Sequence, residues 1–191
     1  ITLIDFIENI HSKLNSINIP VIMLFAKDDK EEIEALDKLI NYHKVRLILL
    51  NNTKINDNRI KYLDSKNIHY ITWGRCGKNS TKYSWIDEDI EFSNNLAINH
   101  LLEKGHKRIG YIDTDLNLNY FSLRKKYFIQ SLNKNKVKVN EEYFVNGYRD
   151  DKQKTKKNIQ NLLLKNEEIT ALFVSSHLFA MHVIDACKEL N

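Results

Sequence analysis

The sequence predicts an α/β fold with two lobes, each a doubly wound parallel sheet flanked by helices. Apolar periodicity switches between helix and strand at about 25-residue intervals, as in parallel strands joined by right-handed crossovers. In residues 97–112, an amphipathic helix is followed by Gly105, which suits a helix end, and by an apolar run from Ile109. With 191 residues, 42% hydrophobic and 28% charged, the chain is predicted to be globular with a substantial core.

Residues 1–89 are predicted to form the first lobe. Its apolar positions favour helix 4–14, strand 19–25, helix 33–40, strand 45–50, helix 56–66 and strand 68–73. Pro20 fits the start of the first of these strands, at a sheet edge. The unbroken apolar tail of residues 45–50 suggests a strand that is covered on both faces.

Residues 90–191 are predicted to form the second lobe. The boundary is placed near Asp87–Asp89, at the end of the long irregular stretch 74–89. The elements expected beyond it are helix 92–104, strand 109–112, helix 123–134, strand 143–145, helix 153–165, strand 169–175 and helix 178–190. In such sheets, ligands bind beyond the carboxyl ends of the strands.

The charges and cysteines bound the possible partners and location. Lysine and arginine number 29 against 25 acidic residues, so the net charge of +4 reflects a mixed, solvated surface. The densest basic run, Lys152 to Lys157, is either an exposed helix face or a phosphate-contacting patch. Cys76 and Cys187 are the only two cysteines, which is too few for a domain held together by disulfides. Both are expected to be reduced, which fits a cytoplasmic protein. Neither a membrane-spanning apolar run nor a leader is recognised, so we expect a soluble chain.

Motifs that would indicate catalysis are not found. Gly74 and Gly77 have no third glycine in register for a phosphate loop, and no serine has nucleophile-elbow spacing. His177 and His182 are five residues apart, which does not place them on one helix face as zinc motifs require. We therefore expect no catalytic residues, no metal and no cofactor, and an enzyme is unsupported.

Several residues are candidates for binding a small molecule. Arg124 follows a polar loop and begins a predicted helix, so its guanidinium either binds a ligand or pairs with a local acid. His177 follows a strand end and either binds a ligand or caps a helix. Asp87 and Asp89 either bind a ligand or cap the following helix. The aromatic side chains that offer a stacking face, or else belong to the core, are Trp73, Tyr120, Phe121 and Tyr148.

Five segments resemble the lactose-repressor/galactose-repressor (LacI/GalR) family of sugar-responsive transcription regulators. They are ITWGR at 71–75, WIDEDIEFSNNLAINHLL at 85–102, GHKRIGYI at 105–112, SLRKKYFIQSL at 122–132 and ITALFVSSHLFAMHVIDACKELN at 169–191. The third is the most specific, because a helix end followed by Gly-His-Lys-Arg-Ile is how this family enters its second lobe. The resemblance implies the two-lobe, type I periplasmic-binding-protein-like fold.

The resemblance also implies site residues and a partial domain. Arg124, Gly74 and Arg75 match positions that contact ligand in the family. Ser176 and His177 stand where the family usually has Asn and Asp, and Arg149 stands about where many relatives have a ring-stacking aromatic; with Trp73 and Tyr148 they complete the expected ligand-binding set. By this resemblance, an opening strand is missing before residue 1 and about a third of the usual domain follows residue 191.

The function implied by the resemblance is that of an effector-binding and dimerisation domain in a repressor. A sugar-like effector between the lobes would favour one lobe arrangement, and operator DNA would be bound by a helix-turn-helix upstream of these residues. The altered pair Ser176 and His177 leaves four alternatives open: a sugar, a phosphosugar, a nucleobase or no ligand at all. Two other functions stay open: an exported sugar-binding protein that serves a transporter, and a cytoplasmic enzyme.

Overall fold

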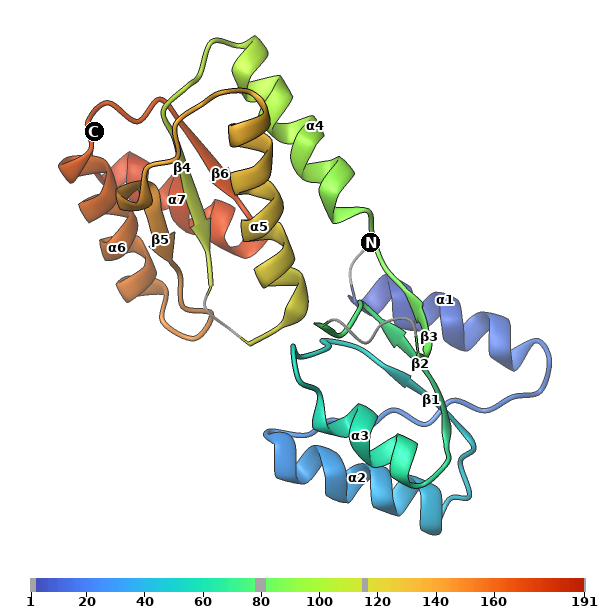
Figure 1. Ribbon diagram of the computed structural model, residues 1–191. Coiled ribbons are helices and arrows are strands. Elements are labelled where there is room, and N and C mark those ends of the chain that lie inside the picture. Colours follow the sequence, from blue (N-terminus) through green and yellow to red (C-terminus); the bar gives the residue numbers. More distant parts are fainter. Residues whose placement is uncertain (1–2, 78–81, 115–116, 191) are drawn as a thin grey trace. The chain divides into compact units, whose positions relative to one another are not determined.

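The computed structural model describes residues 3–77, 82–114 and 117–190 (Figure 1). The chain consists of two compact units. One comprises Ile1–Arg46 with Asn58–Ile68, and the other comprises Leu47–Asp57 with His69–Asn191. In the part of the chain that is described, no helix combines the length and the apolar character that crossing a membrane requires.

The first unit contains three helices, all in predicted places. They are α1 (Leu3–Asn15), α2 (Asp29–Asn41) and α3 (Asn58–Ser65). The carboxylate of Asp28 caps α2 by accepting hydrogen bonds from two backbone N–H groups of its first turn. The hydroxyl of Tyr62 in α3 donates to Asp37 in α2 at 2.6 Å, so α2 and α3 are joined by a direct polar contact.

The predicted strand at residues 19–25 is wrong. This segment has no regular structure, and its apolar side chains are exposed, with Phe25 at 85% and Ile22 at 48%. A strand forms only where a neighbouring backbone satisfies its N–H and C=O groups. No strand among the described residues pairs with the segment. Its apolar composition is that of a strand, but the pairing partner is not there.

The first sheet lies in the second unit and consists of β1 (Leu47–Leu50), β2 (His69–Trp73) and β3 (Ser84–Ile86). The strands are parallel in the order β1-β2-β3, as the alternation of elements predicted. Strand β3 was not predicted and lies inside the stretch taken as irregular. The expectation that residues 45–50 are covered on both faces is also wrong. In β1, burial alternates, with Leu47 61% and Leu49 44% exposed, because only one face of the strand is covered by described residues.

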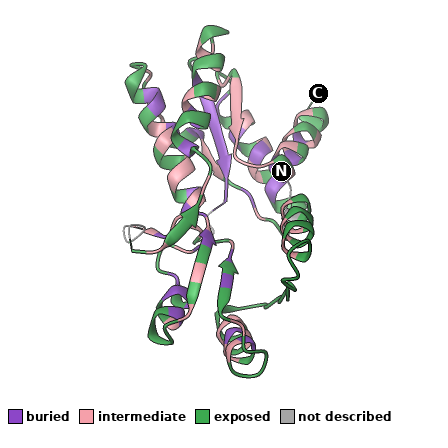
Figure 2. Ribbon diagram, turned by 90° about the vertical axis from the view of Figure 1, so that its right-hand side faces the viewer, coloured by how far each residue is buried: buried purple, intermediate pink, exposed green. Residues whose placement is uncertain are grey.

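The second sheet carries the rest of the second unit. Its elements are α4 (Ile90–Glu103), β4 (Ile109–Asp113), α5 (Asn119–Lys134), β5 (Phe144–Asn146), α6 (Lys152–Lys165), β6 (Ala171–Val174) and α7 (His177–Leu190), after a short 3₁₀ turn at Glu141–Tyr143. Strand β4 is central in the parallel order β5-β4-β6 and is buried along its length (Figure 2). Every helix and strand predicted beyond residue 90 is confirmed, with shifts at the ends.

Helices cover both faces of this sheet, which confirms the doubly wound arrangement (Figure 1). On one face, Ile98 of α4 and Phe128 of α5 pack against Tyr111 of β4. On the other face, Ile159 of α6 and Phe179 of α7 pack in the cluster that contains Ile112 of β4. Successive residues of a strand point to opposite faces, so Tyr111 and Ile112 each belong to a different cluster.

Two sequence signals for helix ends are confirmed. Gly105 has φ +88°, the left-handed conformation that ends α4, and the N–H of His106 reaches back to Leu101. The Asp89 carboxylate accepts a hydrogen bond from the N–H of Phe92 at 2.9 Å and so caps α4. Capping was one of the two roles considered for Asp89. The predicted boundary at Asp87–Asp89 falls between β3 and α4.

Candidate functional site

The carboxyl end of the central strand β4 holds a buried carboxylate. Asp113 is 4% exposed and accepts three hydrogen bonds: from the Tyr111 hydroxyl at 2.5 Å, from the Ser175 hydroxyl at 2.6 Å and from the Thr114 N–H at 2.8 Å. Ser175 directly follows β6, so Asp113 ties together the ends of two neighbouring strands. The edge of the sheet at which ligands bind in this type of fold is therefore internally braced.

Burial sets the protonation behaviour of this group. It raises the pKa of Asp113, while the three hydrogen bonds and the positive charge of Arg124 act in the opposite direction. Burial and the neighbouring Asp113 also raise the pKa of Tyr111, which therefore stays a donor. The sequence analysis did not single out Asp113. The signal was present, since an acidic residue directly follows a buried strand.

Arg124 has two fixed partners on its guanidinium. Nη1 donates to the backbone carbonyl of Ser175 at 3.0 Å, and Nη2 donates to the carboxylate of Glu88 at 2.8 Å. The guanidinium lies over the ring of Tyr120, 5.2 Å from its centroid. Arg124 therefore pairs with an acid, which is one of its two interpretations. Ligand binding by its guanidinium stays a prediction.

The predicted position of Arg124 at the start of its helix is wrong. Helix α5 begins at Asn119, five residues earlier, and has no side-chain cap. Instead, the Asn119 N–H donates to the backbone carbonyl of Thr53, and its side-chain amide donates to the carbonyl of Arg75 at 2.7 Å. The carbonyls of Thr53 and Arg75, distant in sequence, thus hold the first residue of α5 in place of a side-chain cap. No local sequence pattern predicts such contacts.

Gly74 and Arg75 form a second polar group, directly after β2. The Arg75 Nε donates to Asp87 at 2.9 Å, and its guanidinium lies over the Trp85 ring at 5.2 Å. Asp87 thus pairs with an arginine, which is neither of the two roles considered for it. Gly74 has φ +99°, and a Cβ there would lie 3.0 Å from the Thr53 hydroxyl, so this turn favours glycine. Trp73 ends β2 and is half-buried.

The structure brings some of the remaining predicted residues together and leaves others apart. Ser176, rather than His177, contacts the first turn of α7, since its hydroxyl accepts from the Phe179 N–H at 3.4 Å. His177 is exposed, and in the described chain no hydrogen bond or ion pair joins it to Arg124. The charge of Arg149 acts together with that of Arg124 to oppose the rise in the pKa of Tyr120 that burial causes, so Arg149 lies near this site.

Tyr148 and Phe121 both make contacts within the protein. The backbone N–H and carbonyl of Tyr148 both bond the Thr155 hydroxyl, and Lys154 Nζ lies 3.8 Å from its ring centroid. Tyr148 is therefore engaged with α6. Phe121 is 6% exposed and belongs to the core, which is the alternative interpretation given for it.

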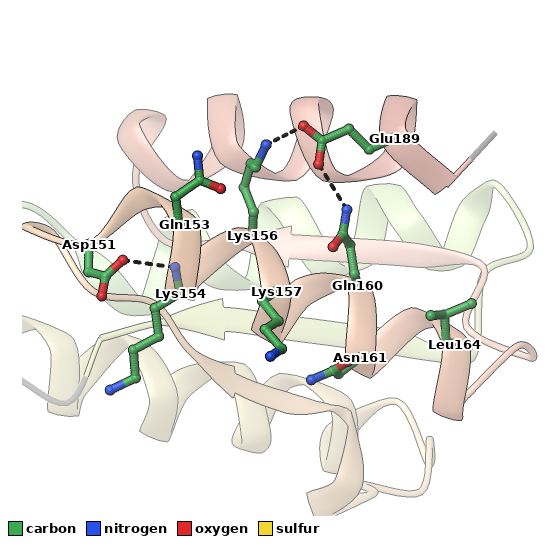
Figure 3. Close-up of a pocket in the computed structure, with 9 residues that line it drawn as sticks. All are labelled: Asp151, Gln153, Lys154, Lys156, Lys157, Gln160, Asn161, Leu164 and Glu189. Carbon is green, nitrogen blue, oxygen red and sulfur yellow. Dashed lines mark hydrogen bonds and ion pairs between the residues drawn. The ribbon is translucent and has the colours of Figure 1, made fainter.

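Three lysines of the basic run, Lys154, Lys156 and Lys157, line a groove of about 580 Å³ on α6 and α7 (Figure 3). Lys152 pairs with Asp185 at 2.8 Å and Lys156 pairs with Glu189, so two of the four lysines connect the helices. The groove favours the interpretation as a solvated helix face, because acids of α7 already compensate the lysines that face them.

A pH dependence arises beside these pairs, at His182 of α7. Its side chain is buried, and its Nδ1 has no hydrogen-bond partner among the described residues. Burial, then the charge of Lys152, lowers the pKa of His182; Lys156 acts likewise and Asp185 opposes. The unfolded chain then binds this proton at a higher pH than the folded chain. We expect the free energy of unfolding to be independent of His182 above about pH 6.5 and to fall as the pH drops below it.

The matched variant His182→Leu removes the titrating group. Urea unfolding at a series of pH values between about 7.5 and 5 should give a shallower loss of stability for the variant than for the wild type. Parallel curves would contradict the assignment, because the remaining pH dependence would then come from carboxylates alone.

The described residues offer no metal centre. No group of three or more His, Cys, Asp or Glu side chains within them is arranged to hold an ion, and Cys76 and Cys187 are not joined in a disulfide. Cys76 is buried, and its thiol donates to the backbone carbonyl of Lys54 at 2.9 Å.

Comparison with known proteins shows what this architecture is similar to. Residues 98–191 match the family model of the periplasmic binding protein-like domain. No curated protein matches the chain. A regulatory protein of the LacI family from Chloroflexus aggregans superposes with a TM-score of 0.83 at 17% identity, covering 97% of this chain and 66% of that one.

Two other solved structures carry ligands in their names. The transcriptional regulator CelR in complex with cellobiose has a TM-score of 0.85 at 19% identity, over 97% of this chain and 56% of its own. A sugar-binding regulator of the LacI family from Escherichia coli, complexed with phosphate, has a TM-score of 0.81 at 17% identity, over 98% and 67%. The present chain thus spans about two thirds or less of these proteins.

The resemblance seen in the sequence is confirmed at the level of the fold. Residues 98–191 match the periplasmic binding protein-like domain, and the described chain has the α/β fold seen in these LacI-family regulators, over about two thirds or less of their length.

Proposed function

We propose that this chain is the effector-binding region of a ligand-responsive transcription regulator, in which a small sugar-like molecule binds in the cleft between two lobes. The observation that carries the proposal is Arg124, whose guanidinium is held by Ser175 at the carboxyl ends of the strands. Supporting it are the regulators of the same fold, two of them named with cellobiose or phosphate. The mechanism is a shift of population toward the lobe arrangement that binds effector more tightly.

The partners proposed are a second copy of the chain and operator DNA. Met181 and Ile184 are 59% and 47% exposed on α7, and their spacing of three places them on one face of the helix. An exposed apolar face of this kind suits a homodimer contact. We assign DNA binding to a helix-turn-helix outside these residues, in a cytoplasmic repressor.

Replacement of Arg124 tests the function directly. A panel of neutral mono- and disaccharides that includes cellobiose is titrated against wild type, Arg124→Leu and the exposed control Arg46→Leu by calorimetry. We expect wild type to bind at least one member, and Arg124→Leu to lose about 10- to 100-fold in affinity, the loss expected when hydrogen bonds from a charged group are removed. Arg46→Leu should stay within about twofold.

Two results would contradict the proposal. If no saccharide binds the wild type, the ligand class is wrong. If Arg124→Leu binds as wild type does while remaining folded, the site is wrong. A saccharide that binds must in addition change the affinity of the full-length gene product for DNA; binding without that change would favour a binding protein that serves a transporter.

A further inference from the structure

A pocket beside Arg124 has features that the proposed function does not use. It has a volume of about 210 Å³ and is lined by Glu88, Ser93, Asn94, Arg124 and the strand end Phe173–Ser175. Its walls come from α4, α5 and β6, with Glu88 just before α4. We call it the Arg124 pocket. It contains one cation, one anion, an apolar ring and three further polar side chains, those of Ser93, Asn94 and Ser175.

Asn94 lines this pocket and carries a buried acceptor without a partner. The residue is 2% exposed, and its Nδ2 donates to the Ile90 carbonyl at 2.8 Å, which fixes the orientation of the amide. Its Oδ1 is one of three buried side-chain atoms without a hydrogen-bond partner among the described residues. A buried acceptor without a donor is unfavourable, so a ligand that brings an O–H or N–H group to Oδ1 is favoured.

Glu88 decides which charge such a ligand carries. Its carboxylate lies 2.8 Å from Arg124 Nη2, so the guanidinium is neutralised inside the pocket. The buried Asp113 lies within electrostatic range of the same guanidinium. An anionic ligand has to displace Glu88 from Arg124 and then stay close to its negative charge. A neutral hydroxyl needs neither, because a guanidinium has five N–H donors and the contacts with Ser175 and Glu88 use two of them.

We propose that Glu88 is a specificity-determining residue, which selects uncharged hydroxyl-bearing ligands against phosphorylated or carboxylate-bearing ones, with Asn94 Oδ1 accepting a ligand hydroxyl. This rests on the proposed function, in which Arg124 contacts the effector. Both ligand classes occur among proteins of this fold, since one is named with cellobiose and another with phosphate. Specificity of this kind arises from a repulsive group placed against the wrong ligand.

The test uses inorganic phosphate as the anionic probe, because its binding can be measured without knowing the effector. Phosphate is titrated at low ionic strength against wild type, Glu88→Gln and the double variant Glu88→Gln/Arg124→Leu, with ³¹P NMR line broadening as the readout. Glu88→Gln keeps the shape of the side chain and removes its charge. Glu142→Gln is the matched control, since Glu142 is an exposed acid paired with Lys165 far from this pocket in sequence.

We expect Glu88→Gln to bind phosphate about fivefold more tightly than wild type, the scale on which a partly exposed charge pair acts. The gain should shrink as salt is added. It should vanish in the double variant, and Glu142→Gln should behave as wild type. Equal phosphate affinity of wild type and Glu88→Gln would overturn the proposal, as would a gain that persists without Arg124.

Failure of this inference is distinguishable from failure of the proposed function. The function fails when no neutral saccharide binds through Arg124, whereas the inference fails when phosphate binding ignores the charge of Glu88. Asn94→Ala adds a second readout. It should weaken binding of a neutral saccharide about tenfold while leaving stability the same or higher, because the unsatisfied acceptor is removed. Unchanged saccharide affinity in Asn94→Ala would overturn the part assigned to Oδ1.

Discussion

Truncation of Phe128 to alanine is expected to lower the free energy of unfolding by about 3–5 kcal/mol. The side chain is fully buried on α5, and its ring centroid lies 4.7 Å from that of Tyr111, 5.3 Å from Phe173 and 5.8 Å from Phe144. The other three rings belong to strands β4, β5 and β6, so the ring of Phe128 packs α5 against the sheet. Alanine would leave a cavity whose walls are rigid rings, which collapse poorly.

Urea denaturation of Phe128→Ala measures this loss, with Phe92→Ala as the matched control. Phe92 lies on α4 but is 64% exposed, so its truncation should change stability by no more than about 0.5 kcal/mol. Similar values for the two variants would show that the aromatic cluster contributes no more than a surface ring. An altered dependence on denaturant would indicate instead that the unfolding transition has lost cooperativity.

Gly147→Ala is expected to destabilise the second unit by about 1–3 kcal/mol, through overpacking. A Cβ at this position would lie 2.6 Å from Cε1 and 2.7 Å from Cδ1 of Phe179. The Phe179 ring is 1% exposed and packs in the cluster on the α6 and α7 face, so it has little room to rotate away. The turn after β5 therefore requires glycine because of a close approach rather than because of its backbone angles.

A double-mutant cycle isolates this close approach. Phe179→Leu removes the ring edge that the new methyl group would meet, at a cost of its own. In that background, Gly147→Ala should cost at least about 1 kcal/mol less than in the wild type. Additive effects of the two substitutions would place the origin of the glycine requirement elsewhere in the turn.

The second half of the chain was predictable because its signals are local. Gly105 ends a helix, Asp89 caps one, and the apolar positions of helices α4 to α7 follow the helical period. Each of these helices can therefore be recognised from its own residues. Residues 19–25 show the limit of such signals. Their composition satisfies every local criterion for a strand, but a strand also needs a neighbour, and neighbours are not encoded in the segment itself.

The sequence marks only some of the candidate site. Arg124 was singled out because it follows a polar loop and because it matches a position in the family pattern, and the structure adds its contacts with Ser175 and Glu88. Glu88 and Asn94 occupy unremarkable positions at the start of an amphipathic helix, so nothing in their spacing distinguishes them from surface residues. Their significance comes from a neighbour 30 or more positions away in sequence, contact with which only the folded chain provides.

The way in which Asn119 is held has an evolutionary consequence. The groups that receive its two hydrogen bonds are the main-chain oxygens of Thr53 and Arg75, and these persist whatever side chains occupy those positions. Mutation can therefore vary the side chain at position 75, and with it the chemistry offered near β2, without releasing the start of the helix that carries Arg124. A helix start anchored in this way lets the side chain at position 75 change between descendants while the helix that carries Arg124 keeps its place.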